Sequence, residues 1–142
     1  MGASPAKASQ WSGKLHPRRD EVEAAQVLLA GALTAHNFDE AICFAVRLAL
    51  EEALVNAFRH GNRDDPTKHA LVDWSITDDE VTIQVTDQGS GFDPGSVPDP
   101  TAEENLEIPS GRGIMLMRAY MTEVEHLAPG NMVRLVYRRK QS

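Results

Sequence analysis

Two polar residues, Glu52 and Asn56, lie four positions apart in an otherwise largely apolar stretch. Four-residue spacing places side chains on one face of an α-helix, so a carboxylate and a carboxamide could act on one ligand. A carboxamide oxygen is a hard, neutral ligand suited to Mg²⁺, and a carboxylate can orient a hydroxyl or accept its proton. On this spacing alone, a solvated helix face is the plainer interpretation.

A second polar segment, Asp87-Gln88-Gly89-Ser90-Gly91, directly follows an apolar stretch that alternates like a strand. An aspartate at a strand end can accept a hydrogen bond from an exocyclic amine. The glycines let the backbone turn sharply and approach a ligand closely. A plain glycine-rich turn is an equally good interpretation of the segment in isolation.

A third segment, Ser110-Gly111-Arg112-Gly113, precedes a helical pattern that begins at Ile114. Backbone amides that lead into a helix N-terminus can bind an anion such as phosphate, and Arg112 could add positive charge. A flexible joint before a helix is the alternative. The chain contains neither a Walker A loop nor a Rossmann glycine fingerprint.

Periodic apolar residues predict the elements that must position these segments. The predicted helices span residues 19–36, 39–60 and 114–122, and the predicted strands span residues 70–77, 81–86, 124–127 and 132–137, with a short edge strand at 11–16. Short turns between neighbouring strands indicate antiparallel pairing, and the clustering of helices early in the chain indicates one helical layer. We therefore expect an α+β fold, a two-layer α/β sandwich with a mostly antiparallel mixed sheet and helices on one face.

Taken together, the three segments resemble the nucleotide-binding boxes of the GHKL ATPases, which share the Bergerat ATP-binding fold. The compact chain most resembles the bacterial anti-sigma factor serine/threonine kinase branch of that superfamily. The resemblance implies a single GHKL-type ATP-binding kinase domain over residues 11–142, with an ATP lid at 92–111. The small, polar residues 1–10 are expected to form a flexible leader.

The resemblance also implies a role for each residue that matches the boxes. It makes Glu52 the general base, Asn56 the ligand of Mg²⁺ beside ATP, and Asp87 the carboxylate that binds the adenine amino group. The remaining positions line the adenine pocket or wrap the phosphates of ATP: Gly89, Gly91, Gly111, Arg112 and Gly113. In the closing hairpin, Asn131 stands where family members often carry threonine.

The function implied by the resemblance is an ATP-dependent serine protein kinase that acts as an anti-sigma factor. Its partners would be a sigma factor and an anti-anti-sigma protein of the STAS type, which it phosphorylates. A homodimer is possible through the sheet beside the N-terminal strand. The alternatives are a non-catalytic, ATP-gated protein-binding module and a histidine-kinase-like ATPase domain that acts in trans.

Composition narrows the remaining classes of function. The chain has 142 residues, a net charge of −7 and one cysteine, and no apolar run approaches the ~20 residues of a membrane helix. Its basic cluster, Arg138-Arg139-Lys140, is interpreted as a solvated tail. We therefore expect a cytoplasmic protein that binds no membrane and makes no direct contact with nucleic acid.

Overall fold

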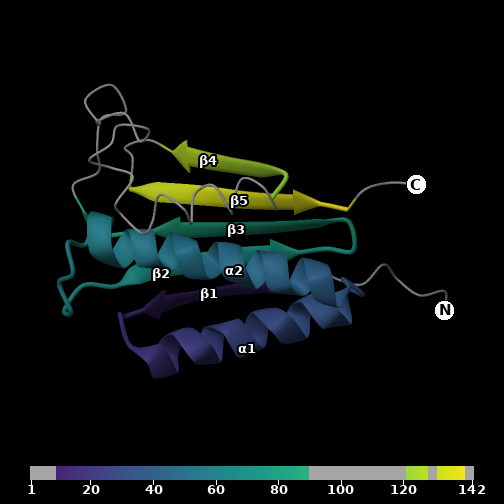
Figure 1. The fold of residues 1–142 in the computed structure, drawn as a ribbon, viewed down its shortest axis with the longest axis horizontal. Helices are drawn as coiled ribbons and strands as arrows, with labels where there is room; N and C mark the ends of the chain where they lie inside the picture. The colour runs from purple at the N-terminus through teal and green to yellow at the C-terminus, as the bar shows by residue number, and fades with distance from the viewer. Residues whose placement is uncertain (1–8, 90–120, 128–130, 140–142) are drawn as a thin grey trace.

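The computed structural model describes residues 9–89, 121–127 and 131–139 (Figure 1). It shows two long helices on one face of a five-stranded sheet, and this arrangement confirms the expected two-layer α+β sandwich. The helices are α1 (Arg19–Ala35), α2 (Glu40–Asn56) and the short π-helical η1 (Ala57–Gly61). The strands are β1 (Ser9–Leu15), β2 (Ala70–Ile76), β3 (Glu80–Thr86), β4 (Glu123–Leu127) and β5 (Met132–Arg138).

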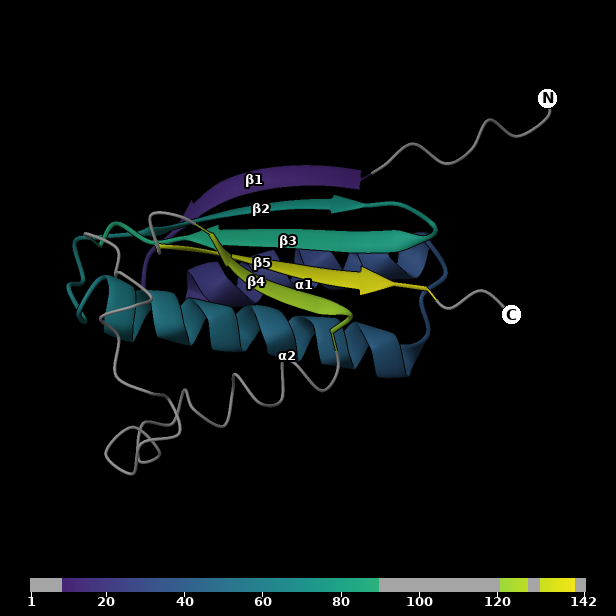
Figure 2. The same cartoon turned by 90° about the horizontal axis from the view of Figure 1, so that it is seen from above.

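The sheet has the strand order β1-β2-β3-β5-β4, and every described pairing is antiparallel. The predicted edge strand is confirmed as β1, which begins at Ser9 and pairs with β2 along its whole length. Side chains of β2 alternate between buried and half-exposed positions, because successive residues of a strand point to opposite faces. Figure 2 shows that α1 and α2 lie side by side under one face only.

The core lies between the two helices and this covered face of the sheet. Leu29 and Leu33 of α1 and Leu50 of α2 are fully buried there against Ile83 and Leu135 of the central strands. Each fully buried side chain of this size contributes about 1.5–3 kcal/mol through the hydrophobic effect. The same packing fixes the rotation of α2, and therefore the direction in which its polar residues point.

Both ends of α2 are set by local hydrogen bonds. At the start, Asp39 is the N-cap, since its side chain accepts a hydrogen bond from the backbone N–H of Ile42 at 2.9 Å. At the other end, the predicted helix runs to residue 60, whereas the α-helix ends at Asn56 and continues as the wider η1. The backbone N–H of Asn62 donates to the Ala57 carbonyl at 2.8 Å, a five-residue step that opens the last turn.

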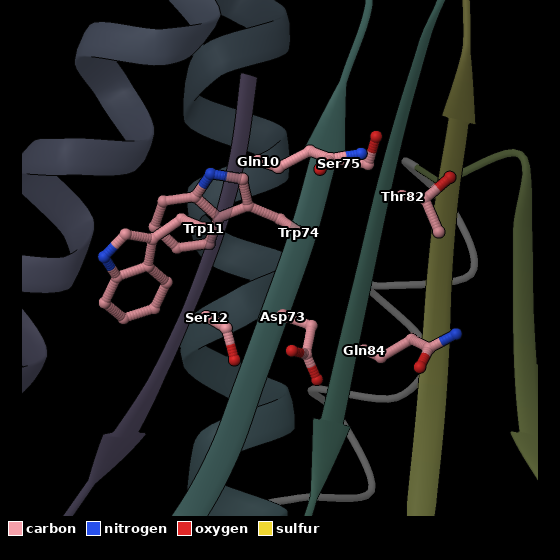
Figure 3. Close-up of a pocket in the computed structure, with 8 residues that line it drawn as sticks. All are labelled: Gln10, Trp11, Ser12, Asp73, Trp74, Ser75, Thr82 and Gln84. Atoms are coloured by element: carbon pink, nitrogen blue, oxygen red, sulfur yellow. The ribbon is translucent and has the colours of Figure 1, made fainter. Parts of the chain in front are cut away.

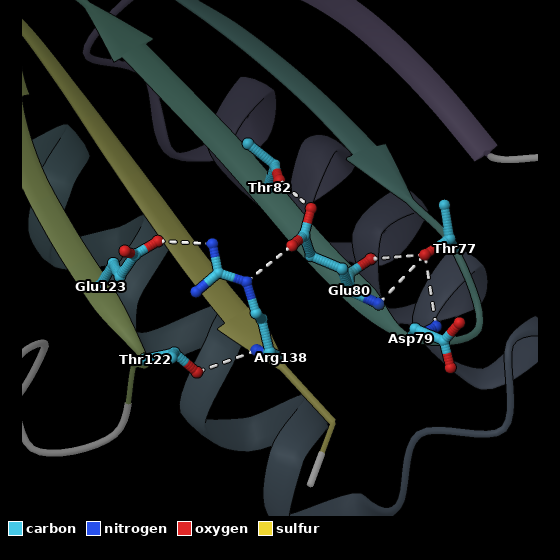
Figure 4. A network of polar contacts seen from close by, with 7 residues as sticks. All are labelled: Thr77, Asp79, Glu80, Thr82, Thr122, Glu123 and Arg138. Carbon is cyan, nitrogen blue, oxygen red and sulfur yellow. Dashed lines mark hydrogen bonds and ion pairs between the residues drawn. The ribbon is translucent and has the colours of Figure 1, made fainter. Parts of the chain in front are cut away.

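Arg138 and Arg139, predicted as part of a solvated tail, are both exposed but make fixed contacts, and Lys140 lies outside the described residues. Arg138 belongs to β5 and pairs with Glu80 at 2.9 Å and with Glu123 at 2.8 Å (Figure 4). Arg139 donates hydrogen bonds to the backbone carbonyls of His36 and Asp78. These two arginines therefore tie β5 to its neighbours.

The remaining predicted helix falls mostly outside the described residues. Its last two residues, Met121 and Thr122, form a bend before β4 in place of a helical turn. The Thr122 hydroxyl accepts a hydrogen bond from the backbone N–H of Arg138 at 2.8 Å, so β5 holds this residue outside a helix. Among the described helices, none is both long enough and apolar enough to span a membrane.

Candidate functional site

The last turn of α2 carries a buried oxygen atom with no hydrogen-bond partner. Asn56 Oδ1 is buried and accepts no hydrogen bond within the described part of the chain. A buried polar atom without a partner costs about 1–3 kcal/mol, and such an atom is open to a water molecule, an ion or a ligand. The oxygen therefore fits the Mg²⁺ ligand predicted from sequence. No cluster of three or more His, Cys, Asp or Glu side chains that could hold a metal ion occurs in residues 9–89, 121–127 and 131–139.

One turn before Asn56, the Glu52 side chain is half-buried on the same helix. Burial raises the pKa of its carboxyl group, and the nearby charge of Glu51 raises that pKa further. Glu51 itself is exposed. A carboxylate with a raised pKa is a better proton acceptor near neutral pH, which is the property a general base requires.

Asp87 follows β3 directly and points its carboxylate toward the end of η1. Burial raises the pKa of this carboxyl group, while a hydrogen bond from the backbone N–H of Gly89 to Asp87 Oδ1 at 2.8 Å opposes the rise. Asn131 holds the Asp87 backbone, since the Asp87 N–H donates to the Asn131 carbonyl at 2.8 Å. The Asn131 side chain donates to the Asp87 carbonyl at 3.1 Å, so the asparagine that replaces the family's threonine has a positioning contact here.

Two glycines allow the Asp87 loop to pack directly against the helix end. A Cβ atom at Gly61 would overlap the Asp87 carboxylate, and one at Gly89 would overlap the Gly61 carbonyl oxygen. Neither position can therefore carry a side chain without moving the loop. The contact brings Asp87 next to η1, which begins directly after Asn56, so the candidate metal ligand and the candidate adenine ligand lie at the same end of α2.

Asn62 is a further residue of the site that the sequence pattern did not reveal. It lies just beyond the helix predicted over residues 39–60, yet it is 2% exposed and hydrogen-bonds to the loop after β3. Gly61 likewise lies just beyond that predicted helix. Their partners lie about 26 residues away in the chain, and no local spacing indicates such a contact.

The structure thus brings Glu52, Asn56, Asp87 and Gly89 together at one end of the sheet. The other predicted positions, Gly91, Gly111, Arg112 and Gly113, and the predicted lid at 92–111 lie outside the described residues. A separate hollow lies on the outer face of β1, β2 and β3 (Figure 3). It is lined mainly by uncharged polar side chains, and none of the predicted site residues borders it.

Comparison with known proteins agrees with this geometry. Residues 15–137 match the family described as the histidine kinase-like ATPase domain. The chain is 34% identical to an anti-sigma F factor of Clostridium perfringens over 83 residues, which cover 56% of this chain and 59% of that protein. It is 33% identical to an anti-sigma F factor of Clostridium beijerinckii over 101 residues, which cover 67% of this chain and 68% of that protein.

A third relative is the serine-protein kinase RsbW of Oceanobacillus iheyensis, 25% identical over 118 residues, which cover 79% of this chain and 75% of that protein. The matches to the Clostridium perfringens proteins span about three fifths of their length. The resemblance to the anti-sigma kinase branch of the GHKL ATPases is confirmed by these relatives. Since the family match covers most of the chain, the protein belongs to the histidine kinase-like ATPase family.

Proposed function

We propose that this protein is an ATP-dependent serine protein kinase that acts as an anti-sigma factor. Its protein substrate would be an anti-anti-sigma protein of the STAS type, and its binding target a sigma factor. The observation that carries the kinase assignment is that Glu52 lies one helical turn before Asn56, whose Oδ1 has no hydrogen-bond partner among the described residues. The named relatives, anti-sigma F factors and a serine-protein kinase, support the same assignment.

Each described site residue has a task in this proposal. Asp87 would accept a hydrogen bond from the adenine amino group of ATP, with Gly61 and Gly89 keeping the loop close enough to enclose the base. Asn56 Oδ1 would hold Mg²⁺, which neutralises phosphate charge during transfer. We assign Gly91, Gly111, Arg112 and Gly113 to the phosphates on the basis of the family resemblance.

The reaction would be a direct transfer to a serine hydroxyl. The serine oxygen forms a bond to the γ-phosphorus, the bond to the β–γ bridging oxygen breaks, and ADP leaves. The hydroxyl proton passes to the Glu52 carboxylate, whose raised pKa suits it to this role. Phosphoryl transfer depends mainly on positioning and charge neutralisation, so this small set of side chains is chemically sufficient.

The alternatives are an ATP-gated binding module without catalysis and a histidine-kinase-like ATPase domain that acts in trans. The half-buried Glu52 favours the kinase, because a module that only binds has no use for a carboxylate that burial disfavours.

The test combines the purified protein with Mg²⁺, γ-labelled ATP and a lysate of the source cell, with Glu52→Gln as the comparison. We expect the wild type alone to label a small protein on serine. Binding of Mg-ATP without any labelling would support the binding module, and label on histidine would support the trans-acting ATPase. Absence of both binding and labelling would refute the nucleotide site itself.

We also propose that the protein forms a homodimer in the cytoplasm through the β1 side of the sheet. β1 is an edge strand with one unpaired side, and such edges are ready to pair with another chain. Beside this edge, the hollow of Figure 3 has Asp73 as its only charged lining residue. Depletion of charge is typical of the centre of a protein interface.

A further inference from the structure

Asn62 is a buried amide at the junction of three segments. Its side-chain oxygen accepts a hydrogen bond from the backbone N–H of Gln88 at 2.7 Å, and its side-chain nitrogen donates to the His69 carbonyl at 2.9 Å. Its own backbone N–H closes η1 by donating to Ala57. One side chain therefore links the end of η1, the residue before β2 and the loop after β3.

The peptide unit between Asp87 and Gln88 is held from two directions. Its N–H donates to the Asn62 side chain, and its carbonyl accepts from the Asn131 side chain. A further bond runs from the His69 backbone N–H to the Gln88 side-chain oxygen at 2.7 Å. Because both polar groups of this peptide are fixed, the direction of the adjoining Asp87 side chain is fixed as well.

We propose that Asn62 is a positioning residue that sets the base selectivity of the nucleotide site by holding Asp87 in its binding orientation. This inference rests on the proposed function, since it takes ATP as the ligand. Asn62 touches neither the base nor the phosphates in this scheme and acts through the Asp87–Gln88 peptide.

The energetic reason is the two part-buried hydrogen bonds that the Asn62 side chain makes. Loss of its amide would remove these bonds from the Gln88 N–H and the His69 carbonyl, and the loop would move to satisfy both groups with water. Asp87 packs so closely on Gly61 that the loop can move only away from the helix end. A hydrogen bond weakens steeply with poor distance and angle, so the amine contact would be lost first.

The experiment compares ATP with inosine triphosphate, which carries a carbonyl in place of the adenine amino group. Calorimetry would give the dissociation constants of both Mg-nucleotides for wild type and Asn62→Ala. A site built to bind a substrate N–H strongly rejects an analogue without it, so we expect the wild type to prefer ATP by about 10- to 100-fold or more. For Asn62→Ala we expect this ratio to fall to about threefold or less, with the affinity for inosine triphosphate nearly unchanged.

Gln26→Ala is the matched control. Gln26 is another buried amide, whose side chain donates to the Arg47 carbonyl at 2.9 Å far from the helix end that carries the site. The Gln26→Ala substitution should lower the melting temperature about as much as Asn62→Ala does, and it should leave the preference for ATP over inosine triphosphate intact. If both variants keep the wild-type ratio, or if Asn62→Ala weakens both nucleotides equally, Asn62 has only a structural role and the inference is overturned.

A second variant covers the case in which Asn62→Ala fails to fold. Gln88→Pro removes the same hydrogen bond from the exposed loop, whereas Gln88→Ala keeps the backbone N–H. We expect the ratio to collapse only in Gln88→Pro, and an equal ratio in both Gln88 variants overturns the inference. Absence of nucleotide binding by the wild type would instead refute the proposed function.

Discussion

Glu52 and Asn56 hold polar groups in surroundings that disfavour them. Burial disfavours the charged form of Glu52, and Asn56 Oδ1 has no hydrogen-bond partner among the described residues. Both features reduce the stability of the ligand-free protein. Functional sites commonly carry such costs, because the groups are arranged for a ligand and not for the fold. Replacing these polar groups with neutral ones should therefore stabilise the folded protein and reduce its activity.

The first prediction follows from the raised pKa of Glu52. A native pKa above the unfolded value means that the native state favours the protonated form. Its stabilising contribution is then fully present below the unfolded value of about 4.3 and is lost as the pH rises through the native pKa. Glutamine resembles the protonated form, so Glu52→Gln should match the wild type near pH 4 and melt about 1–2 °C higher at pH 7.

Thermal unfolding of the ligand-free protein across this pH range checks the prediction. Glu51→Gln is the control, since Glu51 is exposed and its removal should change the melting temperature less. A Glu52→Gln variant that melts lower than the wild type at pH 7 would show that the charged carboxylate is stabilising. The site would then lack the unfavourable burial on which the general-base role of Glu52 rests.

At the scale of elements, the sequence predicted what depends on local periodicity. The alternation of Val81, Ile83 and Val85 predicted β3, and helical spacing placed Glu52 and Asn56 on one face of α2. The π-helical end of α2 was not predictable, because η1 is stabilised by long-range packing of Gly61 on Asp87. The contacts of Arg138 and Arg139 were missed for the same reason, since their partners come from distant turns and strands.

The second prediction concerns this contact between η1 and the loop after β3. Gly61→Ala should weaken ATP binding by about 10-fold or more, because its Cβ would overlap the Asp87 carboxylate and displace it. Gly31→Ala is the matched control, since a Cβ there meets no atom within 4 Å. In the middle of α1 this change should stabilise the protein by about 0.5–1 kcal/mol and leave binding unchanged.

Calorimetry with Mg-ATP and thermal unfolding of both variants would separate these effects. Equal ATP affinity in Gly61→Ala and the wild type would mean that the Asp87 loop tolerates displacement. The close packing of η1 on the loop would then have no part in recognition of the base.

The whole molecule has two unlike faces. The helices cover one face of the sheet, while the other face bears no helix among the described elements (Figure 2). The hollow on that other face is lined mainly by polar side chains. Charged residues on this outer face pair with one another toward β4 and β5, as Arg138 does with Glu80 and Glu123. Toward β1, the hollow on this face has Asp73 as its only charged lining residue, so the β1 side and the β4 side of the sheet differ in what they can bind. The proposed nucleotide site lies near Asp87 and does not include the residues of this hollow.

The third prediction tests whether the β1 side of the sheet is a dimer interface by adding a single charge there. Ser75 lines the hollow and lies directly between Gln10 of β1 and Thr82 of β3. Its side chain points away from the core, so Ser75→Arg should fold normally. In a dimer that buries this surface, an unpaired guanidinium costs several kcal/mol, so we expect the dimer dissociation constant to rise about 100-fold or more. Ala24→Arg adds the same charge at an exposed position of α1 and should leave the dimer intact.

Sedimentation measurements over a range of concentrations would show a dimer for the wild type and Ala24→Arg and a monomer for Ser75→Arg. A wild type that stays monomeric with Mg-ATP present would refute the homodimer, and a dimer that survives Ser75→Arg would place its interface elsewhere.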